Sequence, residues 1–256
     1  MNKLEFLNCI KSNDEVFISN IFEKISLAQR TGATIYTNEF CTPDIWKKTV
    51  GLQNLLGINI SSCGIFKSSE RQMLAFSSDI VEYFPIKLIK IENKSKFNNV
   101  THRDYMGAIM SLGISRKKLG DFVVFDNECY VATSEDICEY IINNLTSIGR
   151  YPCKVSEYDS YMGEIPDIKF EEISLIVTSL RLDCLISEIC NTSRSKALTL
   201  ISNGSVLVDY DVNREKSYPV KYGDTITIRG YGKYKVVSDT GITGRQRIKL
   251  LIKKFV

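Results

Sequence analysis

The stretch from Arg181 to Asp209 constrains the fold most strongly, because it predicts two short helices and a strand in immediate succession. Apolar residues at positions i, i+3, i+4 and i+7 give the first helix one buried face, made of Leu182, Leu185, Ile186 and Ile189. The second helix begins at a hydroxyl residue and ends at Gly204, and "SVLVD" then predicts a strand. So dense a pattern predicts a compact helix–helix–strand module in this part of the chain.

Two cations, Arg194 and Lys196, stand in the first turn of that second helix. A helix N-terminus carries partial positive charge, so cations there oppose the helix dipole unless an anion binds. One interpretation is that this turn receives an anion. The other is a surface helix whose cations are simply solvated.

The charge of the chain is unevenly distributed. The whole sequence carries a net +3, but the part from Thr178 onward holds 14 Lys and Arg against 7 Asp and Glu, which leaves the remainder at −4. A basic C-terminal third favours a localised anion-binding surface, although a solvated charged face fits the same numbers.

Patterning predicts an α+β fold with three domains, at residues 1–82, 83–165 and 178–256. The first is a small unit of helices around short strands, with predicted helices over 6–32 and 41–57. In the second, the order strand–helix–strand–strand–helix–strand is that of a ferredoxin-like domain, the fold of many RNA-recognition domains. Its predicted elements are "PIKLIKIEN", "THRDYMGAIMSLG", "DFVVFDN", "CYVATS", "SEDICEYIINNLTSIG" and "YPCKVSEY". The polar stretch "YMGEIPD" marks its end, and "FEEISLIVTSL" predicts a strand that leads into the last domain.

The last domain resembles the S-four RNA-binding domain, named for protein four of the small ribosomal subunit. The family pattern stands here as Arg181-Leu182-Asp183, Ser193-Arg194, Gly204-Ser205-Val206-Leu207-Val208 and Gly223-Asp224. One departure is Tyr210, where many members have a glycine with its freedom at positive φ, so the shape of this turn is open. The resemblance implies that the start of the second helix faces RNA backbone. The predicted RNA-binding residues are Arg181, Ser193, Arg194, Lys196, Arg229, Lys233, Tyr234, Arg245 and Arg247.

From about Tyr83 onward, "THRDYMGAIMSLGISRKKLGDFVV" ahead of "SLRLD" is similar to the YlmH family of bacterial proteins. That resemblance implies a non-enzymatic, cytoplasmic RNA-binding protein in ribosome-associated quality control. The implied partners are rRNA and tRNA on the large ribosomal subunit that carries peptidyl-tRNA. A link to cell division has also been attached to the family.

A second RNA contact is predicted at the start of the central domain's first helix and at "SRKK", and comprises His102, Arg103, Arg116, Lys117 and Lys118. A structural role in capping the helix is the alternative for His102. The order "HRD" at His102–Asp104 resembles a kinase catalytic loop, but the asparagine and the DFG sequence that a kinase requires are missing.

Other site classes lack their signatures. Eight scattered cysteines form no CxxC pair and only one histidine occurs, so neither a metal nor a disulfide framework is predicted. There is no P-loop or GxGxxG sequence, so we expect no cofactor and no small-molecule substrate. No apolar run is long enough for a membrane span, and the N-terminus has no signal-peptide pattern. The alternatives to a non-catalytic factor are an RNA-modifying enzyme, either a pseudouridine synthase or a methyltransferase accessory, and a division-linked scaffold.

Overall fold

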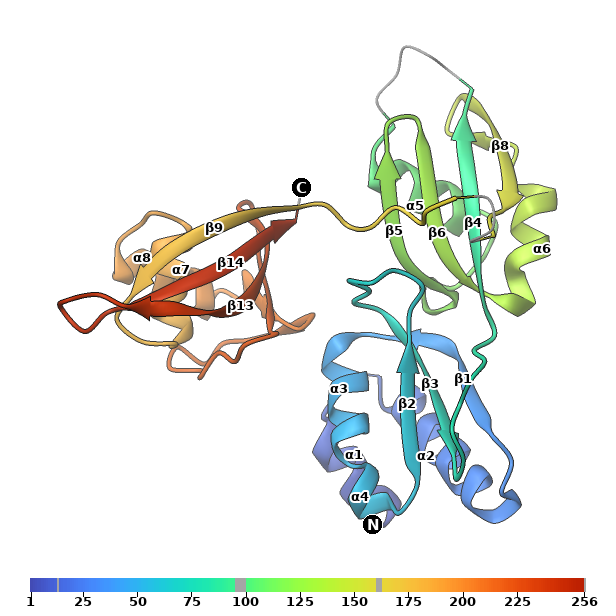
Figure 1. The fold of residues 1–256 in the computed structure, drawn as a ribbon, viewed down its shortest axis with the longest axis horizontal. Coiled ribbons are helices and arrows are strands. Elements are labelled where there is room, and N and C mark those ends of the chain that lie inside the picture. Colours follow the sequence, from blue (N-terminus) through green and yellow to red (C-terminus); the bar gives the residue numbers. More distant parts are fainter. Residues whose placement is uncertain (13, 95–99, 160–162, 256) are drawn as a thin grey trace. The chain divides into compact units, whose positions relative to one another are not determined.

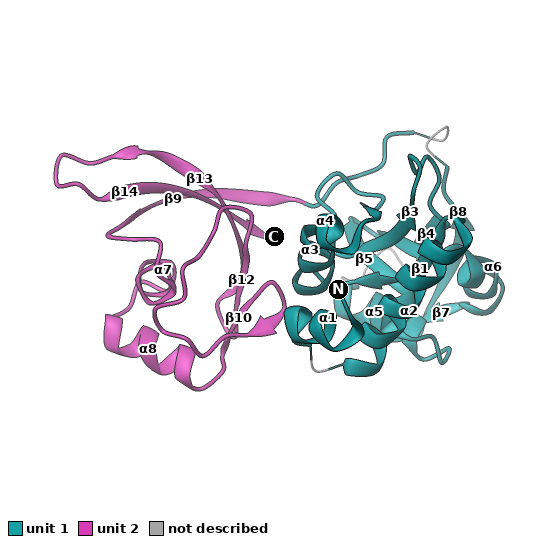
Figure 2. Ribbon diagram, turned by 90° about the horizontal axis from the view of Figure 1, so that it is seen from below, with its two compact units in different colours: residues 1–168 teal, residues 169–256 magenta. Residues whose placement is uncertain are grey.

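A computed structural model describes residues 1–12, 14–94, 100–159 and 163–255. The chain separates into two compact units, Met1–Ile168 and Lys169–Val256 (Figure 2). Helices accompany antiparallel sheets in both units, so the predicted α+β class is confirmed. Asn13, inside the predicted first helix, and Tyr161 and Met162, inside the predicted boundary stretch, lie outside the described residues.

The N-terminal part of the first unit is a three-stranded sheet packed against helices (Figure 1). The strands run in the order β1 (Ile35–Cys41), β3 (Gln72–Ser77) and β2 (Asn59–Cys63), and the helices are α1 (Lys3–Ile10), α2 (Glu15–Thr31), α3 (Pro43–Gly51) and α4 (Gln53–Leu56). The single helix predicted over 6–32 is wrong, because Lys11 takes a left-handed conformation at φ 48° that ends α1. Asp14 then caps α2 by accepting the Phe17 N–H at 3.0 Å. The helix predicted over 41–57 likewise divides in two, at Leu52.

The central part of the first unit is a five-stranded sheet in the order β5-β6-β4-β8-β7. Its elements are β4 (Ile86–Asn93), α5 (His102–Met110), a 3-10 turn η1 (Arg116–Lys118), β5 (Leu119–Phe125), β6 (Glu128–Ser134), α6 (Glu135–Asn144), β7 (Ser147–Ile148) and β8 (Tyr151–Glu157). β4 pairs with both β6 and β8, so the strand that opens this part lies inside the sheet. The helix predicted over 134–149 is too long. Leu145 leaves the helical conformation, and Ile148 pairs with Tyr151 in the short β7–β8 hairpin.

Alternation along the central strands sends their side chains into two cores. On one face, residues such as Ile89 and Val131 pack with Tyr105 of α5 and Ile141 of α6. On the other face, a second core includes Phe40, Phe66, Met73, Leu88, Val123, Tyr130 and Ala132, which come from both parts of the unit. Apolar packing therefore joins the N-terminal and central parts within the first unit, and their division into two domains near residue 82 stays a prediction.

The second unit is a six-stranded sheet with two helices on one face (Figure 2). Its elements are β9 (Phe170–Val177), α7 (Leu182–Ile189), α8 (Arg194–Ser202), β10 (Val206–Val208), β11 (Asp211–Val212), β12 (Thr225–Ile228), β13 (Gly232–Ile242) and β14 (Ile248–Phe255), in the sheet order β11-β10-β12-β13-β14-β9. β9 pairs with β14 along its whole length, so the compact unit begins at Lys169 and includes the strand that precedes residue 178.

The second unit has one core between its helices and its sheet. Leu182, Leu185 and Ile186 of α7 are fully buried, as the helical spacing predicts. β13 continues to Ile242 through two irregularities in its pairing with β14, and the connecting turn is closed by the hydrogen bond from the Thr243 N–H to the Arg247 carbonyl. Across the described ranges of both units, no helix combines the length and the apolar character that crossing a bilayer requires.

Candidate nucleic-acid interface

The starts of α7 and α8 meet around one buried carboxylate. Arg181 is the N-cap residue of α7, Asp183 lies in its first turn, and Arg194 is the first residue of α8. The Asp183 side chain is only 1% exposed, whereas those of Arg181 and Arg194 are 45% and 60% exposed. Two cations that are distant in sequence therefore share one anion at the surface of the unit.

The geometry at Asp183 is that of a double clamp. Arg181 donates from Nε and Nη2 to the two carboxylate oxygens, both at 3.1 Å. Arg194 donates from Nε at 2.9 Å and from Nη2 at 2.7 Å, both to Oδ2. Burial alone would raise the pKa of Asp183, but the hydrogen bonds from Arg181 and Arg194 lower the pKa below its ordinary value. The carboxylate is therefore ionised at neutral pH and fixes both guanidinium groups.

Both arginines keep N–H donors that Asp183 does not use. Arginine carries five N–H donors in a rigid fork, and the contacts to Asp183 use Nε and Nη2 of each arginine. The outer Nη1 group of each is left for another acceptor. Because the fork is already held in place, less side-chain entropy is lost when a phosphate binds.

The first turn of α8 adds to this positive surface. Ser193 caps the helix, since its hydroxyl accepts the Lys196 N–H at 3.3 Å. Lys196 is exposed, and no acidic residue lies in this turn. The partial positive charge of the helix start, the Lys196 ammonium and the two guanidinium groups can act together on an anion such as a phosphate oxygen. Arg181, Ser193, Arg194 and Lys196 form what we call the helix-start cluster.

The other predicted residues of the last domain lie elsewhere. Arg229 is exposed in the turn between β12 and β13, whereas Arg245 and Arg247 are exposed in the loop between β13 and β14. The eleven residues of β13 separate these two groups. The structure therefore divides the predicted set, and brings together only the residues of the helix-start cluster.

Two predicted residues have structural partners within the unit. Tyr234 is 6% exposed, lies in the core, and donates its hydroxyl to the Tyr231 carbonyl at 2.9 Å. Its ring is thus unavailable as a surface for RNA, and it does not belong to the interface. Lys233 is half-buried, and its Nζ donates to the Tyr210 hydroxyl at 2.6 Å and lies 4.6 Å from the centre of the Phe255 ring.

The turn at Tyr210, whose shape the sequence leaves open, keeps positive φ angles. Asp209 and Tyr210 have φ angles of 49° and 78°, and they join β10 to β11 as a two-residue hairpin turn. A glycine-type turn is therefore kept even though Tyr210 has a side chain. Positive φ is costly for a bulky residue, and such strain persists only where surrounding contacts hold it.

In the central part of the first unit, the "SRKK" cations have internal partners. Arg116 donates to the Leu119 carbonyl and, at 3.0 Å, to the Gly120 carbonyl. Lys117 pairs with Asp14, the cap of α2, and Lys118 pairs with Asp136. These contacts stabilise the unit, and an additional contact with RNA stays a prediction.

His102 and Arg103 begin α5, but neither is its cap. Thr101 is the N-cap residue, and Asp104 completes a capping box by accepting the Thr101 N–H at 2.8 Å and hydroxyl at 2.7 Å. The His102 ring lies 5.1 Å from the Phe122 ring, centre to centre. The structural capping role considered for His102 therefore belongs to Thr101.

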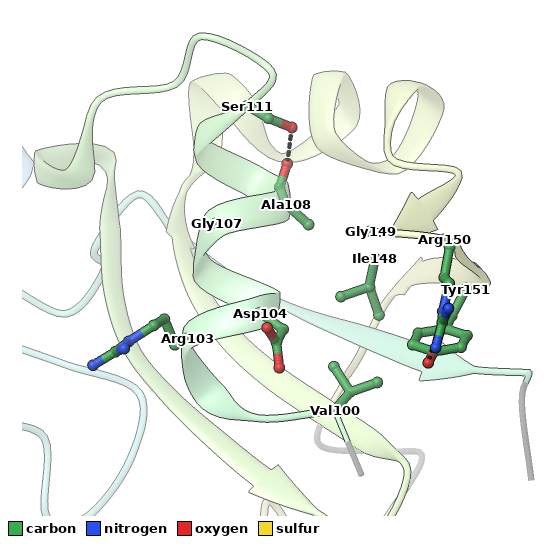
Figure 3. A pocket seen from close by; sticks show the side chains of 10 residues that line it. All are labelled: Val100, Arg103, Asp104, Gly107, Ala108, Ser111, Ile148, Gly149, Arg150 and Tyr151. Carbon is green, nitrogen blue, oxygen red and sulfur yellow. Dashed lines mark hydrogen bonds between the residues drawn. The ribbon is translucent and has the colours of Figure 1, made fainter. Parts of the chain in front are cut away.

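A pocket of about 670 Å³ lies between α5 and the β7–β8 turn (Figure 3). Asp104 points toward its centre, whereas the Arg103 side chain points away from it. Arg150 donates its Nε to the Tyr151 hydroxyl at 3.0 Å. With a carboxylate inside and one arginine turned outward, the charge of this pocket favours phosphate less than the helix-start cluster does.

Sequence reasoning missed the central role of Asp183. The sequence places it in a first turn, where a carboxylate suits the helix dipole, and nothing in the spacing links it to Arg194. A signal was present, because Asp183 lies between Leu182 and Leu185 of the apolar helix face, and an acid in such a place is seldom buried unless it is paired. No group of three or more His, Cys, Asp and Glu side chains able to hold a metal ion occurs among the described residues.

Three comparisons relate this chain to known proteins. Residues 80–161 match the family described as "Putative RNA-binding domain in YlmH". The chain is 30% identical over 171 residues to "Ribosome-associated protein quality control protein P2" of Bacillus subtilis (strain 168), an alignment that covers 67% of this chain and 66% of that protein, just under two thirds. A solved structure, "Cell division protein ylmH from Streptococcus pneumoniae", superposes with a TM-score of 0.51 at 24% identity and covers 59% of this chain and 94% of that one. This last similarity concerns the fold alone.

Proposed function

This chain belongs to the YlmH family, and on that premise we propose that it is a non-enzymatic RNA-binding protein of ribosome-associated quality control. We infer that it binds rRNA and tRNA on the large ribosomal subunit, in the cytoplasm, when that subunit carries peptidyl-tRNA. The relative from Bacillus subtilis is named for ribosome-associated quality control, and the matched family is described as RNA-binding, which supports the proposal.

We also propose a fold for each of the two parts of the chain that we expect to bind RNA. The second unit is an S-four-type domain, supported by two helices that pack on one sheet and by the family residues around Asp183. The central part of the first unit is a ferredoxin-like domain, supported by the sheet order β5-β6-β4-β8, in which the first and third strands of the pattern are central neighbours.

The helix-start cluster carries the proposal. Arg181 and Arg194 are held by Asp183 yet remain largely exposed, and Lys196 stands beside the exposed N–H groups of the α8 start. Phosphate contacts from arginine, lysine and helix N-termini supply most of the sequence-independent affinity for nucleic acid. An arrangement of cations around a buried carboxylate suits recognition of the RNA backbone.

The test is binding of the purified protein to large ribosomal subunits, with and without peptidyl-tRNA, across a potassium chloride series. The variant should combine Lys196→Glu with Arg194→Gln. We avoid glutamate at position 194, because a second carboxylate would face the buried Asp183 and disturb the fold. Lys67→Glu with Arg30→Gln is the matched control, since both residues are exposed in the first unit and the change in net charge is identical.

We expect the wild type to bind tRNA-loaded subunits more tightly, with affinity that falls steeply as salt rises. The helix-start variant should bind at least about tenfold more weakly, with a salt slope shallower by about one to two, and the control should match wild type. Equal loss in both variants would mean nonspecific attraction and would contradict the assigned site. Pseudouridine or methyl groups formed on RNA by pure protein would favour the modifying-enzyme alternative, whereas partners that survive RNase treatment would favour a scaffold.

A further inference from the structure

The sheet of the second unit has a face that its helices leave open. Side chains alternate along a strand, so the residues that flank buried ones point to the opposite face. On β13, Tyr234 and Val236 are buried under the helices, as are Leu250 and Ile252 on β14. Lysines occupy four of the alternate positions of these strands, at Lys233, Lys235, Lys249 and Lys253, and apolar residues such as Leu251 and Phe255 occupy others. α7 and α8 lie on the other side of these strands (Figure 2).

Charge on this open face is strongly one-sided. Lys235 and Lys253 are directly opposite each other in the antiparallel pairing of β13 with β14. Like charges opposite one another destabilise a sheet, because their side chains start only about 5 Å apart. Glu172 pairs with Lys253 at 3.4 Å, whereas Lys235 has no ion-pair partner among the described residues. Lys235 therefore leaves uncompensated positive charge on this face.

Aromatic rings border these lysines. Lys233 lies 4.5 Å from the centre of the Tyr210 ring and 4.6 Å from that of Phe255, whose ring makes an edge contact with Phe170 at 4.8 Å. Tyr210 reaches this position from a backbone at φ 78°, where glycine would be comfortable. A strained residue whose ring is held beside a lysine, on a face with spare positive charge, is an independent sign of a binding surface.

We propose that this open sheet face is a second RNA-binding surface, which takes a single-stranded segment. Its lysines contact the phosphates, and the rings of Tyr210, Phe255 and Phe170 offer flat apolar area to the bases, the combination that single-strand binders use. The inference rests on the proposed function, and it adds a surface on the opposite side of the sheet from the helices. RNA would then contact both sides of the second unit.

The sharpest variant is Lys235→Glu, because RNA binding and folding predict opposite effects. It replaces a cross-strand pair of like charges with a pair of opposite charges, so the thermal unfolding transition of the unit should rise by about 1–5 °C. Affinity for a fluorescein-labelled 20-nucleotide single-stranded RNA, measured by anisotropy, should fall about tenfold, with a salt slope shallower by about one. Lys67→Glu in the first unit is the matched control and should bind as wild type does.

A second variant addresses the rings. Tyr210→Gly removes the ring beside Lys233 and places at this turn a residue that readily adopts positive φ. It should weaken RNA binding about tenfold. If Lys235→Glu and Tyr210→Gly both bind the RNA as tightly as the Lys67→Glu control, the open face is not an RNA surface. The helix-start variant Arg194→Gln with Lys196→Glu would still weaken binding in that case, so the proposed function would stand. Failure of the wild type to bind any RNA would overturn both. Binding to polyglutamate is measured alongside RNA binding. If Lys235→Glu loses binding to polyglutamate but keeps its affinity for RNA, the open face would instead be assigned to an acidic protein.

Discussion

Two nearly identical tetrapeptides have opposite fates in this protein. Ser115-Arg116-Lys117-Lys118 and Ser193-Arg194-Ser195-Lys196 both begin with a serine whose hydroxyl accepts a backbone N–H from within the next turn, in each case at 3.3 Å. In the first, each cation binds a separate partner inside the first unit. In the second, one buried carboxylate holds Arg194 together with Arg181, and the remaining positive charge faces solvent.

The difference lies in the segment immediately after each tetrapeptide. "LGDFVV" after the first is an apolar strand, which leaves room for only a 3-10 turn and places the cations against the protein. "ALTLIS" after the second continues as a helix, which lifts the cations to an exposed end. A basic motif therefore predicts charge, but its neighbours decide whether that charge supports the fold or is available to a ligand.

The largest effect is expected from removing the shared carboxylate. Asp183→Asn would remove the negative charge from all four hydrogen bonds with the two arginines and replace one acceptor oxygen with an NH2 group, and it should lower the free energy of unfolding of the second unit by about 2 kcal/mol. Both guanidinium groups would also become mobile, so RNA affinity should fall while the net charge becomes more positive. Chemical denaturation and RNA binding, measured on the same preparation, check both results. Tighter binding in Asp183→Asn would mean that charge alone governs affinity and that the clamp is irrelevant.

The same carboxylate gives a pH dependence with a definite sign. Because the folded-state pKa of Asp183 is lowered, its contribution to stability is full above the ordinary value of 3.8 and is lost as pH falls through the folded-state pKa. Wild-type stability should therefore fall more steeply below about pH 4 than that of Asp183→Asn. Parallel acid-unfolding curves for the two proteins would contradict this assignment.

In the first unit, we expect a smaller loss of stability and no change in RNA affinity. Lys117→Ala removes the ion pair with Asp14 and the contact over the Phe17 ring, whose centre is 4.2 Å from Nζ. The pair is about half exposed, so the free energy of unfolding should fall by only about 0.5–1 kcal/mol. RNA affinity should stay at the wild-type value. A loss of RNA binding in the folded variant would mean that Lys117 contacts RNA, as the predicted second RNA contact requires.

The smallest effect is expected from replacing the serine that begins each tetrapeptide. Ser193→Ala removes the N-cap of an α-helix and should lower the free energy of unfolding of the second unit by about 1 kcal/mol. Ser115 caps only a 3-10 turn, so Ser115→Ala should lower the free energy of unfolding of the first unit by only a few tenths of a kcal/mol. Paired denaturation curves measure the difference. Equal losses would show that the local hydrogen bond, and not the helix or turn after it, sets the contribution of each serine.

The fold was more predictable than the contacts. Helical spacing correctly identified the buried face of α7. In the central part, the main strands and helices follow one another along the chain in the predicted order, with the short β7 added. Errors fell where a single residue changed the backbone, as at Lys11, which ends α1 in a left-handed conformation, and at Leu145, which ends α6. A periodic pattern contains little information about such breaks, because the residues on either side keep the same spacing.

The candidate site divides in the same way. The sequence by itself determined where positive charge accumulates and which turns begin helices, since both depend on residue type and local spacing. Only the tertiary structure decided that Asp183 joins Arg181 to Arg194, that Tyr234 is buried, and that Lys235 faces Lys253 across two strands. Pairing between residues far apart in the chain depends on how helices pack and on the register of strands, and neither is encoded in the spacing of any one segment.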